Sequence, residues 1–340
     1  MAMRNTIQRR SGLTAALAAA VIVAPAGAQA QSGAEAVPSL TFASQSAPVS
    51  FGLGLDPAGR RFSFADTGES RGEKAGRTFR LALADIPGEV GQIVSFPFRE
   101  PGKTGLFALG IGALVAVDRQ TTAFWQDHVE PAFDAITLPP PLYPALTDLG
   151  ISTESQYLLT GLGLSYAGGV AFNDERAQTA ALLSAKAIGY SYLTSQVILK
   201  PLFGRMRPIE NLSGGGGPSG DFTDDPWDFG NTNGIPWSGG AYGTAMPSFH
   251  FTQYFAVARV YAGLYDNNVV PYLAAGALAA ANIRGHHHWV SDMIAGSAIG
   301  ISIGSLVLNN YEDRKDNADR GFVMPIVSSS GVGFTYSVDF

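Results

Sequence analysis

The chain has 340 residues, with 22 basic and 28 acidic side chains and a formal net charge of −6 at pH 7. This balance argues against nucleic acid as a partner, because nucleic-acid-binding domains normally carry a basic face, although a few arginines in one pocket still suit an anionic substrate. Because the sequence contains no cysteine, disulfides, thiolate catalysis and cysteine-ligated metals are excluded.

The first 30 residues have the layout of a secretory signal peptide. Arg4, Arg9 and Arg10 give a positive start, an apolar stretch runs from Leu13 to Ala24, and residues 28–30 form a small-x-small cleavage pattern. We therefore expect cleavage after residue 30 and an exported protein, either in the periplasm or in a membrane with its site facing the periplasm. An uncleaved N-terminal anchor is the alternative.

Residues 31–102 are rich in Ser, Gly and Pro and carry short charged runs. Apolar and polar residues alternate at residues 61–65 and 78–84, which predicts short strands between loops. We therefore expect an irregular or short-strand N-terminal region that carries no catalytic cluster.

After Lys103 the chain consists mainly of apolar segments rich in Ala, Gly and Leu. The apolar spacing predicts six main helices and a further amphipathic segment at 119–135. The six lie near residues 105–118, 153–172, 177–203, 248–264, 269–285 and 289–309. The expected fold class is therefore all-α, a bundle of about six main helices over residues 103–311.

Two further segments complete this organisation. The glycine-rich stretch 211–245 predicts a long loop between two helices of the bundle. Residues 312–340 end on alternating apolar positions and predict a tail or a small C-terminal hairpin.

Several apolar runs bear on membrane insertion. Charge-free runs cover Ser155–Asn173, Asn267–Ile283 and Met293–Tyr311, close to the roughly 20 residues that a spanning helix needs. Their many Gly, Ala and Ser residues suit close helix packing both in lipid and in a soluble core. We expect membrane association, and the sequence leaves open whether the bundle is soluble or embedded.

The first cluster of candidate functional residues is the segment from Lys200 to Pro208. It places Lys200, Arg205 and Arg207 at the end of an apolar helix, which Pro208 is expected to stop. A simple helix stop or a membrane-edge anchor is one interpretation. The other is anion binding, because arginine is well shaped for bidentate recognition of phosphate.

The second cluster is Met246-Pro247-Ser248-Phe249-His250. Proline and serine suit the start of a helix, where free backbone N–H groups attract an anion. His250 lies just inside the first turn. A lone histidine at such a place is usually structural, so a catalytic role requires partners elsewhere in the chain.

The third cluster supplies such partners, since His288 and Asp292 lie four residues apart and would share one face of a helix. An aspartate that binds one imidazole nitrogen fixes the tautomer and leaves the other nitrogen nucleophilic. A surface ion pair and a zinc-binding run of histidines are the alternatives. Zinc is disfavoured because adjacent histidines point in different directions and no Glu or Cys is spaced to complete a site.

In this order the three clusters resemble the type 2 phosphatidic acid phosphatase and vanadium haloperoxidase superfamily. The patterns of that superfamily are Lys-x6-Arg-Pro, then Pro-Ser-Gly-His, then Ser-Arg-x5-His-x3-Asp. Residues 200–208 match the first pattern fully, residues 247–250 match the second at three of four positions, and residues 288–292 match the end of the third. The resemblance covers roughly residues 104–310.

The resemblance implies a catalytic role for three residues. His288 would attack phosphorus and form a phosphohistidine, and Asp292 would orient and charge-balance His288. His250 would protonate the leaving alkoxide and later activate water. No metal is required in such a mechanism, because a preformed cradle neutralises the phosphate charge.

The resemblance also implies a phosphate cradle. Lys200 and Arg207 would bind phosphate oxygens, and the Ser248 hydroxyl and the Phe249 N–H would donate hydrogen bonds. Phe249 replaces the glycine of the second pattern, so a positive φ would be costly there, and its ring would form one wall of the pocket.

The third pattern departs from the superfamily at its arginine. Counting back from His288 reaches Asn282, and Arg284 follows two residues later. Arg284 would reach the phosphate only where the helix ends or unwinds, and Asn282 would offer a neutral hydrogen bond. Arg205 is a possible substitute for the missing cation.

We therefore expect a phosphatase that hydrolyses phosphate esters through a phosphohistidine. Its partner would be a phosphorylated small molecule or lipid: a lipid phosphate, a polyprenyl pyrophosphate or a soluble monoester. One alternative is a haloperoxidase whose cofactor is vanadate, held by the same residues. The other is a degenerate envelope protein that binds phosphate without turnover.

Overall fold

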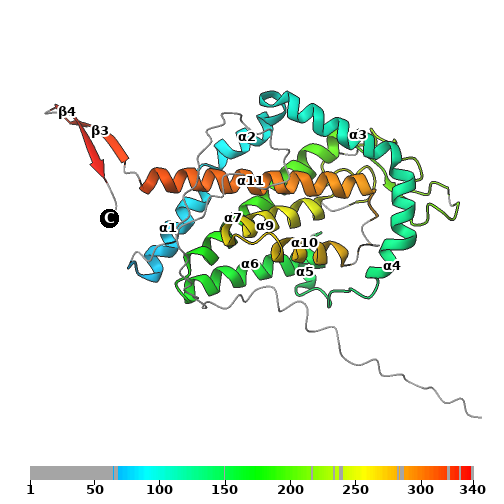
Figure 1. The fold of residues 1–340 in the computed structure, drawn as a ribbon, viewed down its shortest axis with the longest axis horizontal. Coiled ribbons are helices and arrows are strands. Elements are labelled where there is room, and N and C mark those ends of the chain that lie inside the picture. Colours follow the sequence, from blue (N-terminus) through cyan, green and yellow to red (C-terminus); the bar gives the residue numbers. More distant parts are fainter. Residues whose placement is uncertain are drawn as a thin grey trace, which may run out of the picture. The chain divides into compact units, whose positions relative to one another are not determined.

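Helices make up most of the part of the chain that the computed structural model describes (Figure 1). The described residues are 64, 68–148, 150–215, 217–232, 234–236, 240–281, 283, 287–319, 322–328 and 331–337. The predicted signal peptide and almost all of the predicted strand at 61–65 lie outside these residues.

The helices are numbered in chain order. They are α1 (Arg71–Leu83), α2 (Ile86–Arg99), α3 (Pro101–Phe124), α4 (Glu130–Phe133), α5 (Pro144–Asp148), α6 (Thr153–Ala171), α7 (Glu175–Tyr192), α8 (Lys200–Phe203), α9 (Phe249–Tyr265), α10 (Val270–Ala280) and α11 (Val290–Asp319). Two π-helical turns, η1 (Trp125–Val129) and η2 (Leu193–Leu199), continue α3 into α4 and α7 into α8. The all-α prediction is confirmed.

The strands are short. β1 (Arg207–Pro208) pairs in parallel with β2 (Phe222–Thr223), and both lie in or beside the long loop that the sequence predicted. β3 (Phe322–Ser328) pairs antiparallel with β4 (Gly331–Ser337). The predicted C-terminal hairpin is therefore present, although α11 first continues to Asp319.

The core of the bundle forms where α9 packs against α7, α10 and α11 (Figure 1). Its centre holds side chains with no exposed surface, among them Leu183 on α7, Val260 on α9 and Val307 on α11. These residues are apolar on the faces that meet, as expected for helices that pack on one another. α9 therefore lies inside the bundle.

A stripe of glycines on α11 sets the distance between α11 and α9. A Cβ atom on Gly296 would lie 2.5 Å from the Ser248 carbonyl oxygen, and one on Gly300 would lie 2.2 Å from the Thr252 carbonyl oxygen. A Cβ on Gly304 would likewise meet backbone, so the two helices are in contact through their main chains. This contact places the start of α9 against the start of α11.

Replacing Gly300 by valine is expected to destabilise the fold by about 1–3 kcal/mol or more, because backbone cannot move aside as a flexible side chain can. The measurement is the free energy of unfolding in urea. Gly276→Ala in α10 is the matched control, since a Cβ there meets nothing within 4 Å. The control should be stabilised by about 0.5–1 kcal/mol. Equal stability of the two variants would contradict the packing described.

Residues 78–83 of the segment 78–84 are helical, so the strand predicted there was wrong. α1 begins with a capping box, in which Ser70 Oγ accepts the Glu73 N–H and the Glu73 carboxylate accepts the Ser70 N–H. Thr78 and Ala82 are both buried, a four-residue spacing that belongs to a helix. The short alternation of apolar and polar residues gave a wrong prediction, because the capping box and the burial of one helix face stabilise the helix more than the alternation favours a strand.

A buried ionic cluster ties α2 to α7 and α11. Glu89 of α2 has no exposed surface and lies 2.9 Å from the Lys186 ammonium and 2.8 Å from an Arg314 guanidinium nitrogen. The Tyr190 hydroxyl donates to the same carboxylate at 2.6 Å. Residues 71–83 and 86–99 are thus helical and belong to the bundle, which corrects the prediction of an irregular N-terminal region up to residue 102.

One helix in the described part of the chain is long and apolar enough to cross a membrane. It is the stretch Val290–Asp316 of α11, with a mean hydropathy of 1.5 over its most apolar part, half of which is buried in the bundle. The core helix of a soluble protein has the same properties. The structure therefore gives weak support to membrane association.

Candidate active site

Hydrogen bonds bring the three sequence clusters together at one end of the bundle. The Arg205 carbonyl accepts the Ala245 N–H at 2.9 Å, and the Asp292 carbonyl accepts the Ser248 N–H at 3.1 Å. The Trp289 indole N–H donates to the Met206 carbonyl at 2.9 Å. Segments that are far apart in sequence therefore meet where α8 ends and where α9 and α11 begin.

A glycine turn orients the first cluster. α8 ends at Gly204, whose φ of 52° is left-handed, so the helix stops there and not at Pro208 as the sequence predicted. A Cβ on Gly204 would lie 2.7 Å from the Asn231 backbone nitrogen. The turn leaves Lys200 on the helix and places Arg207 on β1, beyond the bend.

Lys200 and Arg207 are basic side chains whose charged groups are largely shielded from water. Burial and the charge of Arg207 lower the pKa of Lys200 well below its ordinary value, and Asp292 opposes this change. Burial lowers the pKa of Arg207 to about 10, again against the charge of Asp292. The Arg207 guanidinium donates to Thr244 Oγ1 from Nε at 3.2 Å and from Nη2 at 3.1 Å. A bound anion would stabilise both cations.

Ser248 carries a buried hydroxyl that has no hydrogen-bond partner among the described residues. The residue has no exposed surface and precedes α9, but its side chain does not cap that helix. Leaving a buried donor unsatisfied costs about 1–3 kcal/mol. The hydroxyl is therefore available to a ligand at the start of α9, where the helix dipole also favours an anion.

Phe249 occupies the glycine position of the second pattern without backbone strain. It is the first residue of α9 and is not among the residues with positive φ, so the expected conformational cost does not arise. Its ring packs edge-on against Tyr192 at 5.7 Å and tilts against His250 at 6.0 Å. The Phe249 ring thus lies between Tyr192, the last residue of α7, and His250, the candidate general acid.

His250 lies in the first turn of α9, two residues after Ser248. Its Nε2 atom is 3.1 Å from the hydroxyl oxygen of Ser152, which is the N-cap of α6. Sequence reasoning did not identify Ser152, although a serine before a helical segment is a common cap. The hydroxyl orients the imidazole, and the catalytic role of His250 stays a prediction.

His288 and Asp292 face one another, but not on a shared helix. The distance from His288 Nδ1 to Asp292 Oδ2 is 3.5 Å, and both side chains are buried. α11 begins only at Val290, and the Asp292 carboxylate accepts the Trp289 N–H at 3.0 Å. The carboxylate thus caps its own helix and faces the imidazole from the first turn.

His287 points elsewhere. Its Nε2 atom is 3.7 Å from a carboxylate oxygen of Glu210, and its ring packs edge-on against Phe222 at 5.2 Å. Its φ of 43° is left-handed, which is uncommon for a residue other than glycine. The turn separates the directions of His287 and His288, so the two imidazoles do not form a pair.

Arg205 is the counter-ion of Asp292 and not a phosphate ligand. Its guanidinium has no exposed surface and lies 2.6 Å from Asp292 Oδ1 and 2.8 Å from Asp118 Oδ2. Trp289 and Phe229 stack on it, each with a ring centroid 5.1 Å away. With these contacts the guanidinium is fully engaged, so Arg205 does not substitute for the missing third-pattern cation.

Arg205 also supports the ionised state of Asp292. Burial raises the pKa of Asp292 above its ordinary value, and the charge and hydrogen bond of Arg205 oppose this rise. Without the guanidinium, the buried carboxyl would take up a proton more readily. Sequence reasoning missed this role because nothing in the spacing of residues 205 and 292 links them.

Asn282 and Arg284 lie outside the described residues, so their places relative to the phosphate cradle stay predictions. The described neighbours are Ala281, at the end of α10, and Ile283, both buried. α10 thus ends at Ala280, earlier than the predicted residue 285. An end before residue 284 is what the expectation for Arg284 required.

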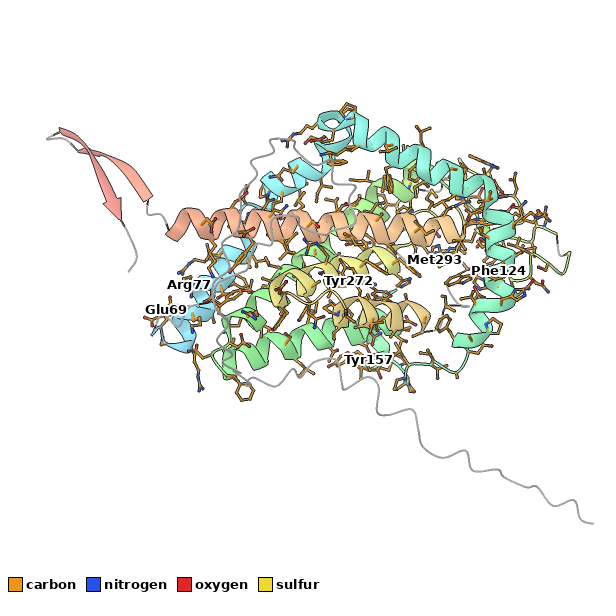
Figure 2. All side chains as sticks on the ribbon, viewed as in Figure 1. Glu69, Arg77, Phe124, Tyr157, Tyr272 and Met293 are labelled. Carbon is orange, nitrogen blue, oxygen red and sulfur yellow. The ribbon has the colours of Figure 1, made fainter. Side chains whose placement is uncertain are left out.

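An open apolar hollow lies beside the start of α11. Its volume is about 470 Å3, and it is lined by Gln120, Thr121, Phe124, Trp125, Val129 and Val290. Figure 2 labels Phe124 and Met293, which lie at this end of the bundle, opposite the Glu69–Arg77 ion pair. Val290 is two residues from His288 in sequence, and none of the residues that line the hollow belongs to the three clusters.

Comparison with known protein families gives one match. Residues 179–316 match the family model described as the PAP2 superfamily, whereas no curated protein and no solved structure matches the chain. The matched range contains all three clusters that meet at the site. The match over residues 179–316 supports the resemblance of this part of the chain to the PAP2 superfamily, the superfamily of the type 2 phosphatidic acid phosphatases.

Proposed function

We propose that the chain is a PAP2-type phosphoric ester hydrolase that acts through a phosphohistidine on His288. The observation that carries this proposal is the meeting of the three clusters, with the buried Ser248 hydroxyl left for a ligand. The PAP2 match supports phosphatase chemistry in general. The contacts of His288 and Asp292 support the particular mechanism.

The phosphoryl group would bind between the first and second clusters. Lys200 and Arg207 neutralise its charge, and the Ser248 hydroxyl and the Phe249 N–H donate hydrogen bonds. Burial destabilises both cations before binding, so the gain on binding an anion is larger than at the protein surface. In this proposal Asn282 and Arg284 complete the cradle.

The chemical steps use two histidines. His288 attacks phosphorus through Nε2, a P–N bond forms, and the P–O bond to the leaving group breaks. Asp292 accepts the Nδ1–H and stabilises the positive charge that develops on the ring. His250 gives a proton to the leaving alkoxide and then takes one from water, whose oxygen attacks phosphorus and releases His288 and phosphate.

The substrate best suited to the surroundings has an apolar tail. The hollow near Val290 and exposed apolar side chains on α2 and α3, such as Phe98 at 84% and Leu109 at 74%, favour a lipid phosphate or a polyprenyl pyrophosphate over a soluble monoester. Access from a periplasmic membrane surface follows from the predicted export. A detergent-dispersed lipid phosphate should therefore give a higher kcat/KM than p-nitrophenyl phosphate.

Trapping the covalent intermediate tests the proposal. After a denaturing quench with 32P-labelled substrate, the label should be stable in alkali and labile in acid, as a phosphohistidine is, and should map to the peptide that contains His288. Hydrolysis should continue in EDTA, because the proposed mechanism uses no metal. Label on another residue, or hydrolysis that EDTA abolishes, would contradict the mechanism.

Vanadate separates the alternatives. A phosphatase of this kind is inhibited by orthovanadate, whereas a haloperoxidase gains halide oxidation by peroxide only when vanadate is added. Phosphate binding with no turnover of any ester between pH 4 and pH 9 would instead identify a degenerate phosphate-binding protein.

A further inference from the structure

A carboxylate outside the three clusters reaches the site from α3. Asp118 has no exposed surface, although most of α3 is exposed and only Val115 and Thr122 are buried with it. The residue lies outside the matched range 179–316. A charged side chain buried on an otherwise exposed helix needs partners that offset its desolvation.

Those partners belong to the machinery of His288. Asp118 Oδ2 lies 2.8 Å from the Arg205 guanidinium, whose other arm binds Asp292. Asp118 Oδ1 accepts the Ser291 N–H at 3.0 Å, and the Ser291 hydroxyl donates to Oδ2. Two carboxylates from different helices thus share one guanidinium.

Thr122, one turn further along α3, makes a separate contact with the same helix start. Its Oγ1 atom accepts the Val290 N–H at 3.1 Å. Asp118 and Thr122 together satisfy two of the free N–H groups at the beginning of α11. Of these two residues, only Asp118 also contacts Arg205. A substitution of Thr122 therefore tests helix capping alone, whereas a substitution of Asp118 tests capping together with the charge on Arg205.

We propose that Asp118 is a positioning residue for the proposed phosphatase reaction, acting on the His288–Asp292 pair through Arg205. It holds the guanidinium at the distance at which Arg205 binds Asp292. It also leaves the group of Asp118, Arg205 and Asp292 with a net negative charge. That charge stabilises the positive ring that forms when His288 is phosphorylated.

The charges around the pair decide the direction of the effect. Arg205 binds both Asp292 and Asp118, and Arg207 and Lys200 add positive charge near Asp292 from the first cluster. Removing the charge of Asp118 leaves this environment more positive. The pKa of the His288 imidazole should therefore fall, since a positive environment disfavours its protonated form.

Asp118→Asn tests the inference, because asparagine has nearly the same shape and keeps an acceptor for Ser291. We expect kcat to fall about tenfold with KM within about twofold, since the nucleophile and not the phosphate cradle is disturbed. The acidic limb of the kcat/KM pH profile should move down by about 0.5–1 unit. Thr122→Val, the matched control, should keep the wild-type pH profile and lose only stability.

Two further measurements keep the outcome decisive. Asp118→Glu keeps the charge but displaces the carboxylate, so kcat should fall without a shift of the acidic limb, and this variant decides if Asp118→Asn fails to fold. NMR titration of His288 should give a lower pKa in Asp118→Asn than in the wild type, whether or not a substrate is turned over.

The possible failures are distinguishable. A wild type that hydrolyses no ester overturns the proposed function, and the NMR titration then still decides on Asp118. An active wild type whose Asp118→Asn and Asp118→Glu variants keep its kcat, its acidic limb and the pKa of His288 overturns the inference alone.

Discussion

His288→Ala is expected to lower kcat for phosphate ester hydrolysis by at least about 10,000-fold, because no other group in the described site is placed to form the covalent intermediate. The substitution removes a ring that lies before α11 begins, so no residue of that helix is changed. The unfolding temperature should therefore stay within a few degrees of the wild type. Initial rates and thermal unfolding, measured on the same preparation, check both parts.

His287→Ala is the matched control for this substitution. His287 is the adjacent imidazole, but it faces Glu210 and Phe222 and not Asp292. Its variant should keep kcat within about threefold of the wild type. Substantial activity in His288→Ala together with its loss in His287→Ala would assign the nucleophile to the wrong histidine.

Arg205→Met is expected to destabilise the protein by about 3–5 kcal/mol at neutral pH and to abolish activity. Methionine fills much of the space but leaves the buried carboxylates of Asp118 and Asp292 without the cation they share. Two like charges would then face one another in a poorly solvated place. Urea unfolding at several pH values measures the loss.

The pH dependence of this loss has a definite sign. Burial raises the pKa values of Asp118 and Asp292 even with Arg205 present, and removing the Arg205 guanidinium would raise these pKa values further. A carboxyl whose pKa is higher in the folded state than in the unfolded state binds protons more tightly when folded, so stability rises as pH falls through the folded pKa. The deficit of Arg205→Met should therefore be largest above the raised pKa values and shrink as the pH falls through them.

Arg205→Met combined with Asp118→Asn is the control for this interpretation. Removing one of the two carboxylates should restore part of the lost stability at neutral pH and weaken the pH dependence. A deficit that is the same at every pH, and that the second substitution does not reduce, would mean that lost packing against Trp289 and Phe229 explains the effect.

The sequence alone predicted the parts of the fold that depend on local chemistry. The long apolar segments predicted the main helices, and Ser248 at the start of α9 was identified from its place before a periodic segment. The strand predicted at 78–84 was wrong because its alternation is local, whereas α1 depends on burial against the rest of the bundle.

The candidate site divides in the same way. The sequence identified five candidate site residues because the superfamily pattern is defined by residue type and by spacing along the chain: Lys200, Arg207, His250, His288 and Asp292. Arg205 was read as a spare phosphate ligand, since a sequence shows the charge of an arginine but not what surrounds it. Its two carboxylate partners lie on different helices.

The opening apolar run of α3 ends at Asp118, and nothing in that run predicts a contact with Ser291 or Arg205. The sequence by itself determined the main helices after Lys103, the three clusters and the resemblance to the superfamily, because these follow from residue type and spacing. Only the tertiary structure decided which charges share a buried environment. Glycines on α11 bring α9 and α11 into main-chain contact, and α3 then closes over the start of α11 with one buried carboxylate.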